Sequence, residues 1–327
     1  MEIIAKVLDK TYPIIIGKDL IKNINRYYTF PKNVLIVYDE NVGGEFLDDF
    51  VDNIMSDVKI YIVKGESSKN FDTYKDIIKV LTLNEFSRSD VIISLGGGAT
   101  SDLCGFVAAT YKRGINLILI PSTTLAMVDA SIGGKNAIDF MGVKNNVGTF
   151  YLPNLVLIDE NILNSLPNEV FNEGLVEALK CGLIKDVELF NLFKGNIKEN
   201  ITKIIAHSIE VKNYFVSKDF YDKNERRYLN FGHTLAHAIE AKTGFEARHS
   251  EAVAYGMVKM TNGKLKEDVK EILDKLDIKY DFNYDINDLR PFILQDKKID
   301  GGLINLVMVD EIGKPYIKKV SIDELGD

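Results

Sequence analysis

Short and almost continuously apolar runs recur through the first half of the chain, separated by segments whose polarity suits helices. Strands that are apolar on both faces are typical of a parallel sheet that helices cover on both sides. The pattern therefore predicts a doubly wound α/β domain with a mainly parallel sheet. The runs are NVLIVY from Asn33, VKIYIV from Val58, DVIISL from Asp90, NLILIP from Asn116 and LVLID from Leu155.

The second half has a different pattern. After Pro167 the next proline is Pro291, and the interval holds long stretches with helical periodicity, such as GLVEALKCGLIKDVELFNLF and EAVAYGMVKMTNGKLKEDVKEILDKL. This predicts an all-α C-terminal domain. We expect residues 1–160 to form the α/β domain and residues 161–327 the helical domain.

Composition narrows the class of protein. The chain has 327 residues, enough for two cores, and a formal charge of −8 that argues against nucleic acid as the main partner. Cys104 and Cys181 offer neither zinc spacing nor a disulfide framework. The N-terminus MEIIAKVLDK lacks the features of a signal peptide, and charged or polar residues interrupt every apolar run before it reaches the length of a membrane span. We therefore expect a cytoplasmic protein.

A glycine-rich turn, GGGATSDLCGF, follows the third apolar run. Glycines let a backbone approach a pyrophosphate, and the start of a helix offers free N–H groups. Ser101 stands where the full dinucleotide fingerprint has its third glycine, so a tight structural turn is an alternative. Asp39, at the end of a predicted strand, is suited to hold ribose hydroxyls. The two features together predict a dinucleotide site.

Three of the four histidines fall in one short window, NFGHTLAHAIEAKTGFEARHSEA. His233 and His237 are four residues apart, His249 follows beyond an irregular link, and His207 lies outside the window. Two imidazoles and one carboxylate form a common open zinc site, and Glu177 can supply the carboxylate. Spacing favours His233 with His237 but does not settle the choice, and a pair that includes His249 remains an alternative.

Charged residues in two other places could carry chemistry. Glu177 and Lys180, in EGLVEALKCG, are one helical turn apart on a face with apolar neighbours, which predicts that the face is partly buried. Arg113, Lys135 and Lys144 stand beside glycines or small polar residues and could bind an anionic substrate. Solvated side chains are the alternative for these cations, and an exposed salt bridge is the alternative for the helical pair.

Taken together, these motifs resemble those of the 3-dehydroquinate synthases, within the sugar phosphate cyclases. The resemblance runs from about Asp39 to DKKIDGG and includes YKRG, VDASIGGK, KNNVG, EALKCG and RRYLNFGHTLAHAIE. The chain departs from the common family pattern at Ser101 and Ala236, where many members have glycine, and in RHSEA, where His-Gly-Glu is common. None of these departures removes a residue with a chemical role.

The resemblance implies specific site residues. Glu177, His233 and His249 would bind a divalent metal, zinc or cobalt, and His237 would contact substrate or phosphate. Contacts to NAD are implied for Asp39, Asn41, Glu66, Lys69, Gly97, Gly98, Asp102, Ser122, Thr123, Lys135 and Lys144. Catalytic or substrate contacts are implied for Arg113, Asp129, Lys135, Lys144, Asn145, Lys180, Lys212, Arg226 and Asn230, together with Lys298 or its neighbour Lys297.

The resemblance also implies an activity, namely a lyase that releases phosphate from a heptulosonate phosphate while NAD is recycled. A homodimer is implied, with Arg113 reaching across its interface. Three alternatives remain at this point: another sugar phosphate cyclase acting on a neutral sugar, a metal-dependent polyol dehydrogenase, and a non-catalytic nucleotide-binding protein.

Overall fold

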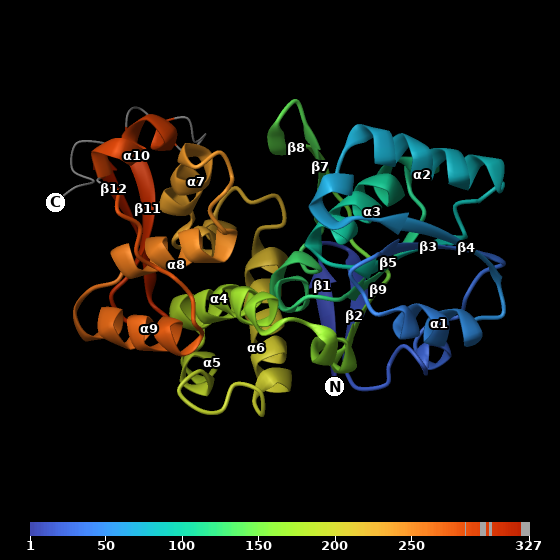
Figure 1. The fold of residues 1–327 in the computed structure, drawn as a ribbon, viewed down its shortest axis with the longest axis horizontal. Coiled ribbons are helices and arrows are strands. Elements are labelled where there is room, and N and C mark those ends of the chain that lie inside the picture. Colours follow the sequence, from blue (N-terminus) through green and yellow to red (C-terminus); the bar gives the residue numbers. More distant parts are fainter. Residues whose placement is uncertain (285, 295–298, 301–302, 322–327) are drawn as a thin grey trace. The chain divides into compact units, whose positions relative to one another are not determined.

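The computed structural model describes residues 1–284, 286–294, 299–300 and 303–321, which divide into two compact units, Met1–Phe171 and Asn172–Asp327 (Figure 1). The sequence analysis placed the boundary between residues 160 and 161, within the segment η5 (Glu160–Ser165) that follows the last strand of the first unit. In the described part of the chain, no helix combines the length and the apolar character needed to cross a membrane.

The first unit is built on a seven-stranded sheet in the order β1-β2-β9-β6-β5-β3-β4. The five apolar runs form β3, β4, β5, β6 and β9, which pair in parallel, while β1 pairs with β2 antiparallel. The predicted α/β class is therefore confirmed. The strands are β1 (Glu2–Val7), β2 (Lys10–Gly17), β3 (Asn33–Asp39), β4 (Asp57–Val63), β5 (Val91–Gly96), β6 (Asn116–Pro121) and β9 (Leu155–Asp159).

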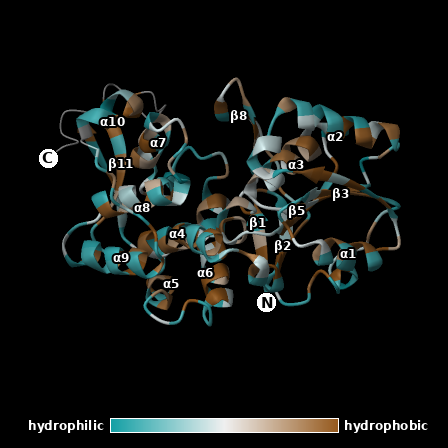
Figure 2. Cartoon of the chain, in the orientation of Figure 1, coloured by the Kyte–Doolittle hydropathy of each residue, from teal (hydrophilic) through white to brown (hydrophobic). Residues whose placement is uncertain are grey.

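Helices cover both faces of this sheet. Figure 1 shows α1 on the opposite side from α2 and α3, and α3 packs on β5 and β6. The central strands are almost wholly buried and appear brown in Figure 2, which explains why their sequences are apolar at nearly every position. The other elements are α1 (Gly44–Asp52), α2 (Phe71–Leu83), α3 (Gly98–Thr110), η1 (Ile24–Arg26), η2 (Gly65–Ser68), η3 (Tyr111–Arg113), the π-helical turn η4 (Ala126–Ala130) and the hairpin of β7 (Lys135–Phe140) and β8 (Val143–Phe150).

The strand order reverses between β3 and β5. The chain leaves β3 for β4 on one side and then crosses to β5 on the other side. In open α/β sheets, ligands bind outside the carboxyl ends of strands at such a switch point. Asp39 and Gly96 are the last residues of β3 and β5, so the acidic residue and the glycine turn singled out in the sequence lie at this point.

The second unit is helical, as predicted, and it also contains a small antiparallel sheet that the sequence analysis did not anticipate. Its helices are α4 (Asn168–Lys185), α5 (Val187–Leu192), α6 (Ile201–Lys218), η6 (Glu225–Asn230), α7 (His233–Lys242), α8 (His249–Lys259), α9 (Gly263–Lys275) and α10 (Ile286–Ile293). Its strands are β10 (Ile299–Asp300), β11 (Leu303–Val309) and β12 (Pro315–Ser321).

Candidate functional site

Asp39 is fixed at the switch point by hydrogen bonds to both of its oxygens. Oδ1 accepts from the backbone N–H of Asn41 at 3.1 Å and from its side-chain amide at 2.8 Å, and Oδ2 accepts from the hydroxyl of Thr100 at 3.0 Å. A Cβ at Gly96 would lie 2.6 Å from that hydroxyl oxygen and 2.9 Å from Cβ of Asp39. Only glycine fits here, so the turn brings the helix start and the acidic residue together.

Lys69 is a buried lysine at the centre of a polar network in the same unit. Its ammonium donates to Asp102 Oδ2 at 2.7 Å and to Asn145 Oδ1 at 2.5 Å, and 5% of its side chain is exposed. Asp139 completes the network, since its N–H donates to the Lys69 carbonyl and its Oδ1 accepts from the Asn145 N–H, both at 2.8 Å. The sequence analysis missed Asp139, because nothing in its own surroundings marks it.

Other residues predicted to contact NAD surround the glycine turn. The N–H of Ser122 donates to the carbonyl of Gly96 at 2.9 Å, directly after β6. A Cβ at Gly97 would approach the methyl group of Thr123 at 3.3 Å. Lys144, in β8, pairs with Glu66 at 3.6 Å on the surface of this unit. The structure thus brings these predicted residues close to the end of β5 and to the β7–β8 hairpin.

Two predicted catalytic residues of this unit lie on unusual backbone. Asp129 belongs to the π-helical turn η4, a geometry that is frequent at functional sites. Arg113 is exposed, and three successive residues have positive φ: Lys112 at 48°, Arg113 at 63° and Gly114 at 127°. The Lys112 ammonium donates to the carbonyl of Phe86 at 2.6 Å and holds this turn.

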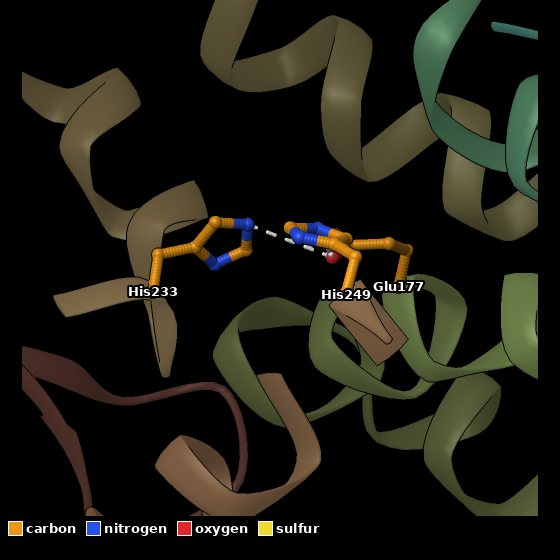
Figure 3. A group of neighbouring side chains, drawn as sticks. All are labelled: Glu177, His233 and His249. Carbon is orange, nitrogen blue, oxygen red and sulfur yellow. Dashed lines mark ion pairs between the residues drawn. The ribbon is translucent and has the colours of Figure 1, made fainter. Parts of the chain in front are cut away.

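The second unit brings Glu177, His233 and His249 together (Figure 3). One ligand atom from each residue lies within 4.8 Å of the others, and Glu177 Oε1 is 3.6 Å from Nε2 of both histidines. Glu177 lies in the middle of α4, whereas each histidine is the first residue of its helix, α7 or α8. Three helices, α4, α7 and α8, thus converge on one point.

The second ring nitrogen of each histidine is held by an acceptor. His233 Nδ1–H donates to the carbonyl of Phe231 at 3.1 Å, and His249 Nδ1–H donates to Glu240 Oε1 at 3.0 Å. These bonds direct both Nε2 atoms toward Glu177, as outer acceptors do for metal-ligating histidines. The sequence analysis missed Glu240. Its position seven residues after His233, about two helical turns, was the available signal.

Glu177 is 3% exposed, and no backbone N–H or hydroxyl of the described residues donates to its carboxylate oxygens. It forms ion pairs with Lys180, one turn along α4, and with the two histidines. Burial alone would raise the pKa of the Glu177 carboxyl, but the charges of Lys180 and His233, with His249 beside them, hold that pKa well below its ordinary value. The predicted burial of the Glu177–Lys180 face is confirmed.

The two imidazoles differ electrostatically. Burial, and then the nearby Lys180 ammonium, hold the pKa of His233 well below its ordinary value. Burial also disfavours the charged form of His249, but the carboxylates of Glu177 and Glu240, one beside each ring nitrogen, outweigh it and raise the pKa of His249 to about 10. A buried carboxylate with two oriented imidazole nitrogens beside it suits a divalent cation such as Zn²⁺ or Co²⁺, so the residues present fit a metal.

Four other predicted residues lie in the same unit. The His237 ring is 5.6 Å from the His233 ring, centroid to centroid, and His237 is not one of the three grouped ligands. Lys212 is buried on α6, and Asn230 ends η6. Arg226 is 3% exposed and donates from Nη1 to the Phe220 carbonyl at 2.7 Å. Lys298 and Lys297 lie outside the described residues.

Family models match most of the chain. Residues 59–173 match the model described as 3-dehydroquinate synthase N-terminal, and residues 174–299 match the one described as 3-dehydroquinate synthase C-terminal. A 3-dehydroquinate synthase from Picrophilus torridus is 38% identical over 338 residues, which cover 99% of this chain and 98% of the relative. The resemblance seen in the motifs is therefore confirmed.

Solved structures of sugar phosphate cyclases share the fold. A 2-deoxy-scyllo-inosose synthase, complexed with carbaglucose-6-phosphate, NAD⁺ and Co²⁺, matches with a TM-score of 0.88 and 22% identity, covering 100% of this chain and 99% of that one. A 2-epi-5-epi-valiolone synthase from Streptomyces hygroscopicus, with NAD⁺ and Zn²⁺ bound, matches with a TM-score of 0.88 and 22% identity, covering 98% and 96%. At this identity the likeness is one of fold.

Proposed function

Because the chain belongs to the 3-dehydroquinate synthase family, we propose that it converts 3-deoxy-D-arabino-heptulosonate 7-phosphate to 3-dehydroquinate and phosphate. The activity is that of a carbon–oxygen lyase acting on phosphates, in the shikimate pathway that leads to the aromatic amino acids. NAD and a divalent metal, zinc or cobalt, are the proposed cofactors. The observation that carries the proposal is the cluster of Glu177, His233 and His249, in a chain aligned with a 3-dehydroquinate synthase over nearly its full length.

The reaction needs both cofactors because phosphate is a poor leaving group from an unactivated carbon. NAD held at the switch point would supply reversible hydride transfer, which makes a proton beside the oxidised carbon acidic enough for elimination. Glu177, His233 and His249 would hold the metal, which would supply Lewis acidity toward a substrate hydroxyl. The protein then has to hold the substrate, move protons and exclude side reactions.

In the first unit, the residues at the switch point would hold the dinucleotide. The Asp39 carboxylate, fixed by Asn41 and Thr100, would accept from ribose hydroxyls. The N–H groups at the start of α3 would face the phosphates, since a helix N-terminus favours anions. Lys69 would hold Asp102 and Asn145 in place beside the cofactor.

In the second unit, Lys180 is the best-placed residue for proton transfer. Its ammonium is buried against Glu177, next to the proposed metal ligands, where proton affinities are readily tuned. Lys212 and Asp129 would share in moving protons through the substrate hydroxyls, and the substrate's own phosphate would act as base in the elimination. The two anionic ends of the substrate would be held in charge-assisted hydrogen bonds by Arg113, Lys135, Asn145, Arg226, Asn230, His237 and Lys298.

The proposal includes a homodimer in the cytoplasm. Arg113 is exposed on a fixed turn of its own unit, which suits a residue that acts on the site of a second copy. Mixing two inactive variants, Arg113→Ala and Glu177→Gln, tests this directly. If Arg113 acts across the interface, hybrid dimers contain one intact site and activity returns on mixing, whereas no recovery after subunit exchange would place Arg113 in its own site.

The defining experiment measures phosphate release by metal-loaded protein with a trace of NAD. The heptulosonate phosphate, glucose 6-phosphate and sedoheptulose 7-phosphate are offered separately. Turnover of the acid alone, with no accumulation of NADH, is expected. Turnover of a neutral sugar would identify a sister cyclase, and steady formation of NADH would identify a polyol dehydrogenase.

A further inference from the structure

The helices that carry the two ligand histidines touch through bare backbone. Gly232 precedes His233 as the N-cap of α7, and Gly256 lies two turns after His249 in α8. A Cβ built on Gly256 would collide with the carbonyl oxygen of Gly232 and would lie 2.7 Å from its carbonyl carbon and 2.8 Å from its Cα. Nonbonded carbon atoms pack at roughly 3.5 Å or more, so the two backbones are as close as glycine allows.

The contact is reciprocal. A Cβ on Gly232 would lie 2.8 Å from the carbonyl oxygen of Val253 and 3.1 Å from the backbone nitrogen of Met257. Every one of these atoms is backbone, so no side chain can rotate away to make room. Larger residues on either helix would therefore have to push α7 and α8 apart.

The position of Gly232 is also fixed by its own helix, α7, and by its backbone conformation. Its carbonyl oxygen accepts from the N–H of Ala236 at 3.2 Å, in the first turn of α7. Its φ of 81° is left-handed, a conformation that glycine adopts without strain and most other residues avoid. The residue immediately before the ligand His233 is thus held by α7 on one side and by α8 on the other.

We propose that Gly256, in contact with Gly232, is a positioning residue for the metal site, because the contact sets the separation between His233 and His249. The inference rests on the proposed metal-dependent function. Metal–ligand distances tolerate changes of only about 0.2 Å. A side chain at residue 256 has to move the start of α7 by several times that amount, whereas Glu177 lies on a different helix, α4.

If Gly256 served only in packing, any loss of packing at this contact should affect the protein in the same way. Met257, adjacent to Gly256 in α8, is fully buried, and its Cγ would lie 3.0 Å from a Cβ on Gly232. Met257→Ala removes packing at the same contact without inserting anything between the helices. Comparing Gly256→Ala with Met257→Ala therefore distinguishes the effect of forcing α7 and α8 apart from a simple loss of stability.

The experiment measures metal affinity of the metal-free protein by titration with Co²⁺, read from its visible absorption, and with Zn²⁺ against a competing chelator. Thermal stability and NAD affinity are measured on the same samples. For Gly256→Ala we expect metal affinity to fall about 10- to 100-fold, the range seen when groups that orient metal ligands are altered, with a changed Co²⁺ spectrum and unchanged NAD affinity. For Met257→Ala we expect lower stability with metal affinity close to that of the wild type.

A second variant that inserts a side chain between the two helices keeps the test decisive if Gly256→Ala does not fold. Gly232→Asn inserts a Cβ at the milder 2.8 Å contact, and asparagine tolerates the left-handed conformation. Wild-type metal affinity in a folded Gly256→Ala or Gly232→Asn variant overturns the inference. So does a loss of metal affinity in Met257→Ala as large as that in Gly256→Ala at equal stability. Failure of the metal site itself is distinguishable, because wild-type protein and Glu177→Gln would then bind Co²⁺ alike.

Discussion

The two units satisfy their buried charges in opposite ways. In the first unit, Lys69 is matched by Asp102 and Asn145, and Asp39 accepts from Asn41 and Thr100, so the polar groups complete one another's hydrogen bonds. In the second unit, no backbone N–H or hydroxyl of the described residues donates to the buried Glu177 carboxylate, which is compensated by charge instead.

The difference follows from the ligand that each place suits. A dinucleotide can be bound by exchanging some hydrogen bonds among groups that are already ordered, so its site can be complete beforehand. A metal ligand must keep its lone pairs free, and a buried carboxylate without donors is costly unless charges nearby compensate it. Lys180 and the two imidazoles supply that compensation in the second unit. The comparison predicts that the two sites respond independently to mutation.

The largest effect is expected from Glu177→Gln. The amide is a poor metal ligand and no longer balances Lys180, so metal affinity should fall by more than about 100-fold and phosphate release should be lost, with NAD affinity unchanged. Metal content after dialysis, together with NAD titration, measures both sites on one sample. Glu169→Gln, an exposed position on the same helix, is the matched control. Full metal retention in Glu177→Gln would contradict the ligand assignment.

A smaller loss in the same unit is expected from Glu240→Gln. Glu240 accepts the Nδ1–H of His249 and so directs its Nε2 toward Glu177, and acceptors of this kind are typically worth 10- to 100-fold in metal affinity. The amide oxygen of glutamine still accepts this hydrogen bond but lacks the charge. We therefore expect metal affinity to fall by about tenfold, the lower end of this range. Chelator competition measures the change. An effect as large as that of Glu177→Gln would make Glu240 a direct ligand.

In the first unit, Lys69→Met should weaken NAD binding by about tenfold. A charge-assisted hydrogen bond contributes about 1.5–3 kcal/mol, and its loss releases Asp102 and Asn145 from a fixed position. Fluorescence titration with NADH measures this change, and metal affinity should stay constant. Lys64→Met, which removes an exposed pair with Glu40, should leave both affinities unchanged. A fall in metal affinity with Lys69→Met would contradict the independence of the two sites.

The smallest effect concerns Asp90, a buried carboxylate of the first unit that accepts hydrogen bonds from Ser87 and Asn33. Burial alone would raise its pKa, but these donors lower it below the ordinary value. The folded pKa is therefore below the unfolded one. The stabilisation is present above an unfolded pKa of about 3.9 and is lost as pH falls through that value toward the folded pKa.

Asp90→Asn should therefore lower the free energy of unfolding by about 1–2 kcal/mol at neutral pH, and the gap to wild type should narrow below about pH 4. Urea titrations followed by circular dichroism at several pH values measure this. A gap that stays constant from neutral to acid pH would show that the charge of Asp90 does not stabilise the fold.

Much of the first unit could be predicted from the sequence, because buried parallel strands need apolar residues at almost every position. Strands that are not buried lack this apolar pattern and were therefore not predicted. Strand β8 is almost wholly exposed and carries no apolar pattern, so Lys144 and its neighbours read as a loop. In the second unit, the all-α prediction was extended to the end of the chain and missed β11 and β12, although β11 has an apolar run, LINLVMV, like those that predicted strands in the first unit.

The metal cluster was only partly predictable from spacing. Helical periodicity puts Glu177 and Lys180 on one face, and the structure bears this out. The same rule favours His237 as the partner of His233, yet the structure groups His249 with them. Periodicity describes a single helix, whereas His249 depends on where the next helix begins relative to α7. The family resemblance supplied that residue, and no local pattern could have done so.

The left-handed turn at Lys112 and Arg113 has a consequence for mutational tolerance. Both side chains are exposed, so surface position alone predicts that almost any residue is acceptable there. Their φ values of 48° and 63° restrict the choice of residue, because β-branched residues are strongly disfavoured at such angles. A saturation library selected for folded protein should be depleted of valine, isoleucine and threonine at both positions, while glycine and asparagine survive. Exposure and substitutability, which usually go together, are separated at this turn.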